Sequence, residues 1–288
     1  MKSNFLLIVL CLTVLFHLKC TENPFFDDDK IPSGGAEIRG SVKLNDEQSS
    51  DGVFVWLQGF NIGSFTDDHG NFKIELPPVS SQINAGVSGI FNLYFYVANY
   101  KVDTSKVFIR SGEVVFSKAD INKKGELSSV KELCKLLHIT TSVEPSIVKK
   151  DYKGEINVTV ILQAVVELVD VLLLLKIVET GERVDLMAGG FLRRIDSDQW
   201  CTEALDVTSL KSVSEPIGFK ARSWKMVFNK KIANLSIGQY EIIPYIVVNQ
   251  NSIPQELFDS LGSNVQSLSF EYLNLPFKRE GGYLEVIE

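Results

Sequence analysis

The sequence predicts an all-β protein built of two β-sandwiches in series, with one short helix between them. Apolar and polar residues alternate over short segments at 38–44, 53–57 and 72–76, and the alternation returns at 156–162. Turn-forming Gly, Asn, Asp and Pro residues separate many of these segments. Strands that bury one face in an antiparallel sheet have this period of two, whereas an amphipathic helix repeats its apolar residues every three to four positions.

The N-terminus has the pattern of an export signal, which has to be set aside before the fold is considered. Lys2 provides a positive charge, and residues 5–18 form an apolar run without an acidic residue. A run of roughly fourteen residues fits the apolar region of a signal peptide, whereas a membrane-spanning helix needs about twenty. The sequence becomes polar at Thr21. We therefore expect residues 1–20 to direct export.

Cys20 closes this segment and resembles the lipid-accepting cysteine of bacterial lipoproteins. That family has a small residue before the cysteine, whereas this chain has Lys19. The resemblance implies that acyl chains on Cys20 anchor the protein at the outer membrane or cell surface. Each buried methylene of such a chain contributes about 0.8 kcal/mol. The alternative is an ordinary signal peptide in which Cys20 has no function.

Residues 21–36 are predicted to be a flexible acidic tether. They contain Asp27-Asp28-Asp29 and Ser33-Gly34-Gly35, and like charges and turn formers disfavour a packed structure. Removing residues 1–19 takes away two of the 29 basic residues, which leaves 27 against 36 acidic residues and a formal charge of −9. A chain without a basic stripe is a poor partner for nucleic acid. The predicted partners are the membrane, through the lipid anchor, and an unidentified protein or polysaccharide.

Residues 37–118 are predicted to form the first sandwich, and they carry a family resemblance. The segments that carry it are Ile38-Arg39-Gly40-Ser41-Val42, Gly52-Val53-Phe54-Val55-Trp56-Leu57, Thr66-Asp67-Asp68-His69-Gly70-Asn71-Phe72-Lys73-Ile74 and Leu76-Pro77. In order and spacing they resemble the carboxypeptidase regulatory-like domain. That family has a G-x-V strand, a G-V-x-V strand, a T-D-x-x-G-x-F hairpin and a strand that ends in L-P. The resemblance implies a small transthyretin-like β-sandwich without catalytic activity.

Three residues of the hairpin have structural roles that follow from their chemistry. Asp67 can accept hydrogen bonds from the turn backbone, Gly70 can adopt a positive φ where the chain reverses, and Phe72 returns to the core. Asp67, Asp68 and Asn71 also have oxygen atoms that calcium prefers, but the hairpin itself needs them. We therefore predict a structural role for this segment and no metal site.

Aromatic residues on the predicted strands of the first sandwich are the best candidates for a binding surface. Phe54 and Trp56 are out of phase with the apolar face of their strand, and Tyr94 and Tyr96 share one face of a further predicted strand at 90–100. Exposed aromatic rings stack on sugars or anchor protein partners. The alternative is that the helix or the second domain covers this face.

Residues 119–153 are predicted to be a short helix followed by a linker. Apolar residues recur with helical spacing over 128–138, and strand periodicity is lost over 140–153, which contains Pro145. We therefore expect two independently folded units, with a protease-sensitive segment between them.

Residues 154–288 are predicted to form the second sandwich. Strand periodicity at 156–162 is followed by a strongly apolar segment at 165–178, which charged residues such as Glu167 and Lys176 interrupt. These charges leave apolar runs too short to span a membrane, so we interpret the segment as core strands. The spacing of the strands is typical of an immunoglobulin-like sandwich.

Two cysteines, Cys134 and Cys201, lie beyond the signal segment. In an oxidising compartment they can pair, but their spacing does not show that they do. Two unpaired, buried thiols are an equal alternative.

The sequence lacks the residues of several common catalytic and metal sites. After the signal segment the histidines are His69 and His138, and neither begins the H-x-x-E motif of a zinc peptidase. Ser128 and Ser146 begin S-x-x-K motifs, but the partner motifs of β-lactamases are absent. Asp120-Ile121-Asn122-Lys123-Lys124-Gly125 resembles the start of a calcium loop, with a lysine where an oxygen ligand is required. We therefore predict no catalytic residues, no metal and no cofactor.

The sequence thus predicts a non-catalytic cell-envelope lipoprotein that acts as a binding or structural module for a protein or polysaccharide partner. The alternative is an accessory domain pair for a separately encoded envelope hydrolase, either a peptidase or a glycosidase. A buried pair of carboxylates in a cleft would instead indicate an enzyme.

Overall fold

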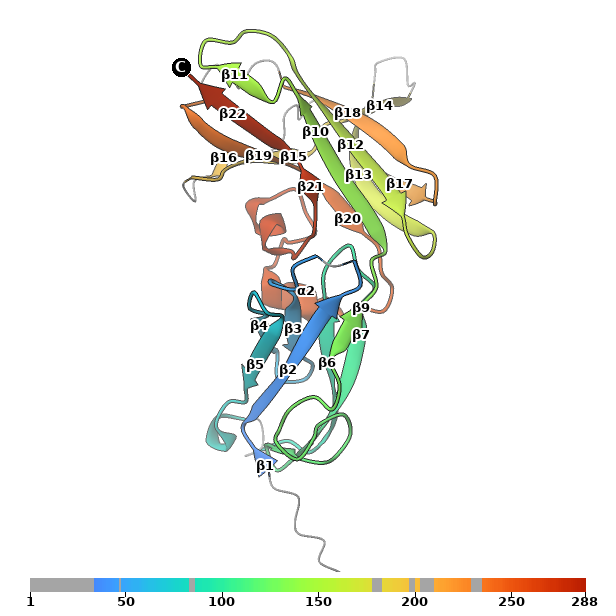
Figure 1. Ribbon diagram of the computed structural model, residues 1–288. Coiled ribbons are helices and arrows are strands. Elements are labelled where there is room, and N and C mark those ends of the chain that lie inside the picture. The colour runs from blue at the N-terminus through green and yellow to red at the C-terminus, as the bar shows by residue number, and fades with distance from the viewer. Residues whose placement is uncertain are drawn as a thin grey trace, which may run out of the picture. The chain divides into compact units, whose positions relative to one another are not determined.

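The structure, a computed structural model, describes residues 34–46, 48–82, 86–177, 183–196, 200–202, 210–228 and 235–288 (Figure 1). Gly34–Glu288 belong to one structural unit. The predicted signal segment, Cys20 and the tether up to Ser33 lie outside the described residues. The order of the elements confirms the predicted all-β class. Within the described ranges, no helix is long and apolar enough to cross a membrane.

The first sandwich consists of two sheets (Figure 1). The larger sheet has the strand order β1-β8-β7-β6-β3-β4. Its strands are β1 (Gly34–Gly35), β3 (Phe54–Leu57), β4 (Ile62–Phe65), β6 (Gly89–Tyr96), β7 (Asp103–Arg110) and β8 (Glu113–Val115). The smaller sheet has the order β5-β2-β9, and its strands are β2 (Glu37–Leu44), β5 (Asn71–Glu75) and β9 (Lys131–Leu133).

The core between these sheets follows from the alternation in the sequence. In β5, Phe72 and Ile74 are buried while the residues between and beside them are exposed. Val55 of β3 and Phe95 of β6 are fully buried in the same apolar cluster. The rings of Phe72 and Phe95 meet edge to face with their centroids 5.8 Å apart, an arrangement that aromatic pairs favour. The two sheets therefore share one core.

The second sandwich also has two sheets. The larger has the order β17-β13-β14-β18-β12-β10-β21, with β20 pairing to β13, and the smaller has the order β11-β22-β19-β15-β16. The strands of the larger sheet are β10 (Leu137–Glu144), β12 (Ile156–Ala164), β13 (Val169–Ile177), β14 (Arg183–Met187), β17 (Leu210–Ile217), β18 (Arg222–Phe228), β20 (Ile246–Val248) and β21 (Glu280–Gly281). Those of the smaller sheet are β11 (Ile147–Lys149), β15 (Gly190–Arg194), β16 (Trp200–Thr202), β19 (Gly238–Pro244) and β22 (Tyr283–Ile287).

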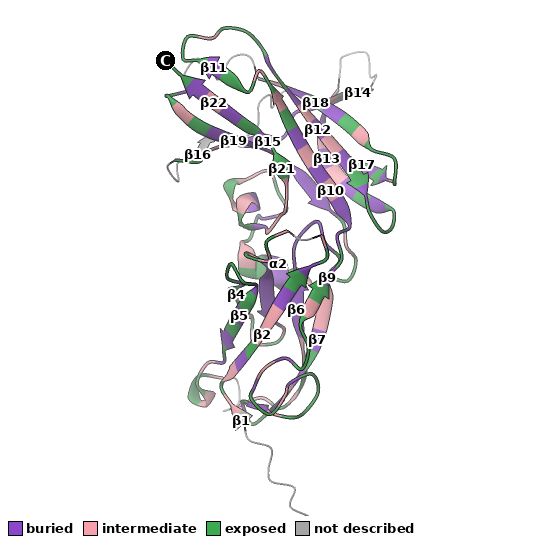
Figure 2. Cartoon of the chain, viewed as in Figure 1, coloured by how far each residue is buried: buried purple, intermediate pink, exposed green. Residues whose placement is uncertain are grey.

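Burial in the second sandwich alternates along its strands, as Figure 2 shows for β10 and β12. In β12, Ile156, Val158, Val160 and Leu162 are fully buried, and Trp224 of the neighbouring β18 joins them. The apolar segment predicted to supply core strands includes β13, whose Leu173 is fully buried. The core strands predicted in this half of the chain are therefore present.

The helix predicted at 128–138 is wrong. The segment contains β9, which pairs in parallel with β2, and the first residues of β10, which pairs with β12. Leu133 and Leu137 are fully buried, but in the cores of different sandwiches, while Val130 is exposed. The helical spacing thus arose because the chain passes from one core to the other within a few residues.

The linker predicted within 119–153 is wrong for the same reason. β10 forms eight residue pairs with β12, from Leu137↔Ala164 to Glu144↔Asn157. β11 pairs with β22, so the second sandwich begins near Leu137 and not at residue 154. At the other end, the predicted tether reaches too far, because Gly34–Gly35 form β1 and pair with β8.

The α-helix of the described chain is α2 (Gln255–Leu261), which follows Pro254 and was not predicted. Leu257 and Phe258 are its buried residues. Two 3₁₀ helices, Val79–Ser81 and Phe270–Asn274, complete the helical segments that the structure describes. With only seven residues, α2 is too short to show a clear periodicity in the sequence.

The predicted hairpin is stabilised by Asp67 and Gly70. Asp67 Oδ1 accepts hydrogen bonds from the backbone N–H groups of His69 at 3.0 Å and Asn71 at 2.8 Å. Gly70 has φ +77°, and a Cβ atom there would collide with the carbonyl oxygen of Val42. The carbonyl oxygen of Gly70 accepts a hydrogen bond from the Val42 N–H at 2.8 Å, which ties the turn to β2.

We expect both Gly70→Ala and Phe72→Ala to lower the urea midpoint of unfolding. The first places a side chain at positive φ, which costs about 1–2 kcal/mol before the collision with Val42 is counted. The second removes a core ring, which costs about 3–5 kcal/mol. Ile90→Ala is the control, because Ile90 is 67% exposed and should change the midpoint little. An unchanged midpoint for Phe72→Ala would contradict this account of the hairpin.

Candidate functional site

The four aromatic residues predicted to form a binding surface lie side by side on the larger sheet of the first sandwich. Phe54 and Trp56 of β3 are directly opposite Tyr96 and Tyr94 of β6. The rings of Trp56 and Tyr94 are tilted against each other, with centroids 5.7 Å apart. All four side chains are buried, and Tyr94, the most exposed, is only 8% exposed. The structure thus brings the four residues together but does not leave them accessible.

The second half of the chain covers this aromatic face. Phe258 of α2 meets Tyr96 at right angles, with ring centroids 5.6 Å apart. Both belong to one apolar cluster, here called the junction cluster. Its buried members are Phe54, Trp56, Tyr94, Tyr96 and Ala98 of the first sandwich and Phe191, Ile243, Tyr245, Val247, Leu257, Phe258, Val265, Tyr272 and Leu275 of the second half of the chain. The prediction of a free binding surface is therefore wrong, because the second domain covers the face.

Tyr272 is the centre of the covering segment. Its ring stacks on Phe191 at 5.4 Å and is tilted against Tyr245 at 4.9 Å. Its hydroxyl accepts a hydrogen bond from the Ile246 N–H at 3.0 Å and donates to the Ile246 carbonyl at 2.9 Å. Desolvation in this cluster raises the pKa of Tyr96 far above its usual range. The rings of this cluster are therefore packed as a core.

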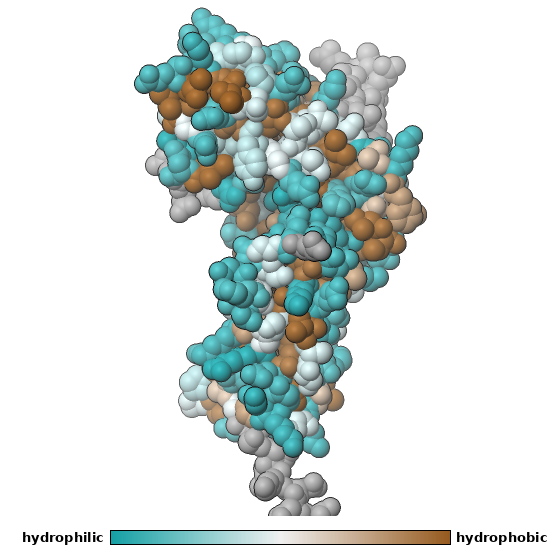
Figure 3. All heavy atoms as spheres, in the orientation of Figure 1, coloured by the Kyte–Doolittle hydropathy of each residue, from teal (hydrophilic) through white to brown (hydrophobic). Residues whose placement is uncertain are grey.

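One face of the remaining surface is mainly hydrophilic (Figure 3). Figure 3 shows one face of the molecule, on which apolar side chains form separate patches among hydrophilic ones. The exposed large apolar residues include Ile90, Leu168 and Phe219. Leu168 and Phe219 lie on neighbouring turns, since a Cβ atom at Gly218 would lie 3.5 Å from the Leu168 side chain, whereas single exposed apolar residues such as Ile90 are normal on folded proteins.

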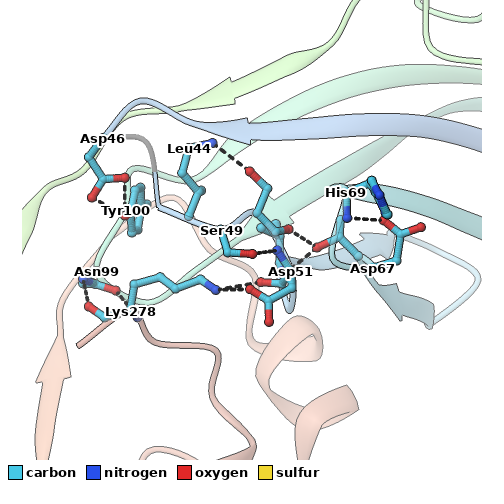
Figure 4. A network of polar contacts seen from close by, with 12 residues as sticks. Leu44, Asp46, Ser49, Asp51, Asp67, His69, Asn99, Tyr100 and Lys278 are labelled. Atoms are coloured by element: carbon cyan, nitrogen blue, oxygen red, sulfur yellow. Dashed lines mark hydrogen bonds and ion pairs between the residues drawn. The ribbon is translucent and has the colours of Figure 1, made fainter. Parts of the chain in front are cut away.

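A buried ion pair lies beside the junction cluster, where the chain crosses between the sandwiches. Lys135 lies between β9 and β10, its side chain is 2% exposed, and its Nζ is 2.6 Å from Asp46 Oδ2. The Tyr100 hydroxyl lies 2.8 Å from both carboxylate oxygens of Asp46 (Figure 4). Burial by itself would raise the pKa of Asp46, but the hydrogen bonds from Lys135 and Tyr100 outweigh it and lower that pKa.

Further polar contacts join the sandwiches around Asn99, which is fully buried (Figure 4). Its side-chain amide donates to the carbonyl oxygens of Leu137 and Lys278, and its Oδ1 accepts from the Lys278 N–H. Lys278 Nζ also forms an ion pair with Asp51 Oδ1 of the first sandwich, at 2.7 Å. Gln250 of the second sandwich accepts a hydrogen bond from the Val102 N–H at 3.0 Å.

Two open hollows flank β4 beside the junction. The first, of about 350 Å³, is lined by Phe54, Asn61, Gly63, Phe65, Ser260, Leu261 and Asn274. The second, of about 460 Å³, is lined by Phe65 and Asn274 again, together with Asp51, Gly52, Arg193, Glu241, Ile243, Leu273, Leu275, Pro276, Phe277, Lys278 and Arg279. Sequence reasoning missed this groove, because the segments that line it, such as 51–65 and 260–279, lie far apart in the sequence.

The residues considered for metal binding form turns. Asp67, Asp68 and His69 are the group of three potential ligands that lie close together in the described residues, and all three are exposed. Asp67 already accepts hydrogen bonds from the hairpin backbone. In the segment that resembles a calcium loop, Asn122 Oδ1 accepts from the N–H groups of Lys124 and Glu126, which closes a turn.

Cys134 is free and exposed, so the alternative of two buried thiols is wrong for this residue. The side chain of Cys201 lies outside what the structure describes. Cys20, the predicted site of lipidation, lies outside it as well.

Comparisons with known proteins found distant similarity to solved structures only. No protein-family model and no curated protein matches the chain. Among solved structures, it is similar to the major pilin subunit BcpA of Bacillus cereus, with 10% identity and a TM-score of 0.26, over 77% of this chain and 60% of that one. It is also similar to the full-length major pilin SpaD of Corynebacterium diphtheriae, with 11% identity and a TM-score of 0.31, over 76% and 64%. The chain thus spans less than two thirds of either pilin, and a likeness at this level assigns no function.

We expect Lys135→Met to destabilise the protein by about 3–5 kcal/mol, because it leaves the Asp46 carboxylate partly buried without its cation. Combining it with Asp46→Asn should recover part of the loss, since the uncompensated charge is then gone. Urea unfolding of the two single variants and the double variant measures this coupling. Additive effects would show that the two side chains do not act as a pair.

The same pair predicts a pH dependence. The pKa of Asp46 in the folded protein lies below its unfolded value near 3.8, so the ionised pair contributes its full stability above that pH and loses it as the pH falls. Between pH 6 and about pH 3, the parent protein should therefore lose more unfolding free energy than Asp46→Asn does. Parallel slopes for the two proteins in thermal unfolding against pH would contradict the assignment.

Proposed function

We propose that this protein is an exported, membrane-tethered β-sandwich protein that acts as a structural or binding module and has no catalytic activity. The observation that carries the proposal is the junction cluster, in which Phe54, Trp56, Tyr94 and Tyr96 are buried by the second sandwich. Protein side chains cover these four rings, so the rings offer no open aromatic surface to a substrate. Such a body suits projection from a surface and the presentation of loops and edges to a partner.

The first sandwich fits a carboxypeptidase regulatory-like domain within this proposal. Asp67, Gly70 and Phe72 have the turn-forming and core roles that the resemblance implies. The G-x-V segment around Gly40 forms β2, which pairs with the hairpin strand β5. Domains of that family are non-catalytic modules that accompany peptidases, outer-membrane receptors and surface lipoproteins.

The proposed tether is an acylated Cys20, and the proposed location is the outer membrane or cell surface. The apolar segment before Cys20 and the acidic segment after it support export and a spacer. In this proposal the partner is a protein or a polysaccharide of the envelope. The acidic balance of the chain disfavours nucleic acid as a partner.

We expect Cys20 to carry a fatty acid when the full gene is expressed in a bacterial host with lipoprotein processing. Labelling with an alkyne fatty acid, followed by gel fluorescence, should mark the parent protein, and Cys20→Ala should abolish the label. The parent should fractionate with membranes, because acyl chains bury their methylenes in the bilayer. Cys134→Ala is the matched control, since it removes the exposed free thiol and should leave the label unchanged. Equal labelling of parent and Cys20→Ala would sink the lipoprotein part of the proposal.

A further inference from the structure

β4 is an open edge of the larger sheet of the first sandwich. In the described part of the chain it pairs with β3, and it ends the strand order β1-β8-β7-β6-β3-β4. The strand runs from Ile62 to Phe65, and its Gly63 and Phe65 are exposed. Edge strands present unpaired backbone N–H and C=O groups, which can pair with a further strand.

The pairing register shows which groups of β4 point outward. The Thr66 N–H donates to the Val53 carbonyl at 3.0 Å, and the Thr66 carbonyl accepts from the Gly52 N–H at 3.0 Å, so Thr66 forms a hydrogen-bonded pair at a bulge in the facing strand. Such pairs alternate along an antiparallel ladder, so Ser64 and Ile62 direct their backbone groups toward β3. Gly63 and Phe65 therefore direct theirs away from β3, where the Phe65 carbonyl oxygen accepts the Ser64 hydroxyl at 3.2 Å and has a second lone pair for a further hydrogen bond.

The space beside β4 is the groove formed by the two hollows. Gly63 and Phe65 line the first hollow, and Ser260 and Leu261 at the end of α2 form its other wall. Phe65 and Asn274 line both hollows, so the groove continues past Phe65 toward Lys278 and Arg279. Residues of β4 thus line both hollows of the groove, together with residues of the second sandwich.

The far end of the groove has an excess of positive charge. Arg193 is paired with Glu241, and Lys278 is paired with Asp51. Arg279 forms no ion pair with any residue that the structure describes. Its guanidinium carbon lies 3.9 Å from the ring centre of Phe277, and its Nη2 donates to the Tyr272 hydroxyl at 2.9 Å, so the group is held in place. An acidic side chain would neutralise it.

We propose that this groove binds an extended, acidic peptide segment of a partner protein, which adds to β4 as a further strand. The N–H and C=O groups of Gly63 and Phe65 bond to the peptide backbone, and Arg279 pairs with a carboxylate. The proposal deepens the proposed function, on which it rests, by naming the class of partner.

The test uses fluorescein-labelled octapeptides and the purified full chain in fluorescence anisotropy titrations. One peptide alternates valine with glutamate, and its counterpart alternates valine with lysine. Two further peptides have the glutamate sequence with N-methyl groups on alternate residues, on the odd positions in one phase and on the even positions in the other. Only one of these phases removes the N–H groups that face β4. We expect the glutamate peptide to bind, the lysine peptide to bind at least about tenfold more weakly, and one methylated phase to lose binding.

Two matched pairs of variants locate the site. Phe65→Pro and Phe65→Val both remove the ring of Phe65, whose centroid lies 5.0 Å from that of Phe54. Only proline also removes the backbone N–H that points outward from β4. Arg279→Met and Arg279→Lys both remove the planar guanidinium, but only methionine removes the charge. We expect Phe65→Pro to bind more weakly than Phe65→Val, and Arg279→Met to bind at least about tenfold more weakly than Arg279→Lys. Thermal unfolding of each variant checks that it is folded.

The outcomes separate this proposal from the general one. Equal binding of the glutamate and lysine peptides, or loss of binding in neither methylated phase, overturns the strand-addition proposal. So does sedimentation of the full chain as a dimer that Phe65→Pro dissociates, because a second copy then occupies the edge. Each of these results leaves fatty-acid labelling of Cys20 unaffected, and absent labelling leaves peptide binding unaffected.

Discussion

The arrangement of the described molecule depends on the burial of one aromatic face. Trp56 and Tyr96 would be exposed on an isolated first sandwich, and each gains about 1.5–3 kcal/mol when the second sandwich excludes water from it. The covering residues come from β15, β19 and β20 and from the segment between 253 and 277, so most of the C-terminal part of the chain is needed to close the face. The two sandwiches keep separate cores, but this third cluster joins them into one unit.

The sequence was informative wherever a strand buries one side in its own sandwich. β2, β5 and β12 alternate strictly enough that their core residues could be predicted, and their turns contain residues whose chemistry is specific. Gly70 is the clearest case, because its positive φ and its approach to Val42 tolerate no side chain. These features are local, so a single sequence contains all the information that they require.

The errors have one cause, which is that periodicity shows which face is apolar but not what covers it. The sequence predicts a free surface for Phe54 and Trp56 because they lie opposite the core face of β3, yet β3 is buried on both faces. The segment around Leu133 and Leu137 appeared helical because its apolar residues serve two cores in turn. The groove beside β4 could not be predicted for a related reason, since Phe65 and Arg279 line the same hollow only in the folded chain.

Apolar burial is not directional, so it does not by itself fix how one sandwich is oriented on the other. The polar contacts at the edge of the junction cluster supply that direction. The Asn99 side chain forms hydrogen bonds with the backbone of Lys278 and with the backbone of Leu137 at the start of β10. A small rotation of one sandwich relative to the other would break these bonds. Lys278 also reaches Asp51, and Arg279 follows it in the chain. The network that orients the sandwiches therefore also fixes the charged end of the groove relative to β4, and a groove held in this way requires little ordering when a partner binds.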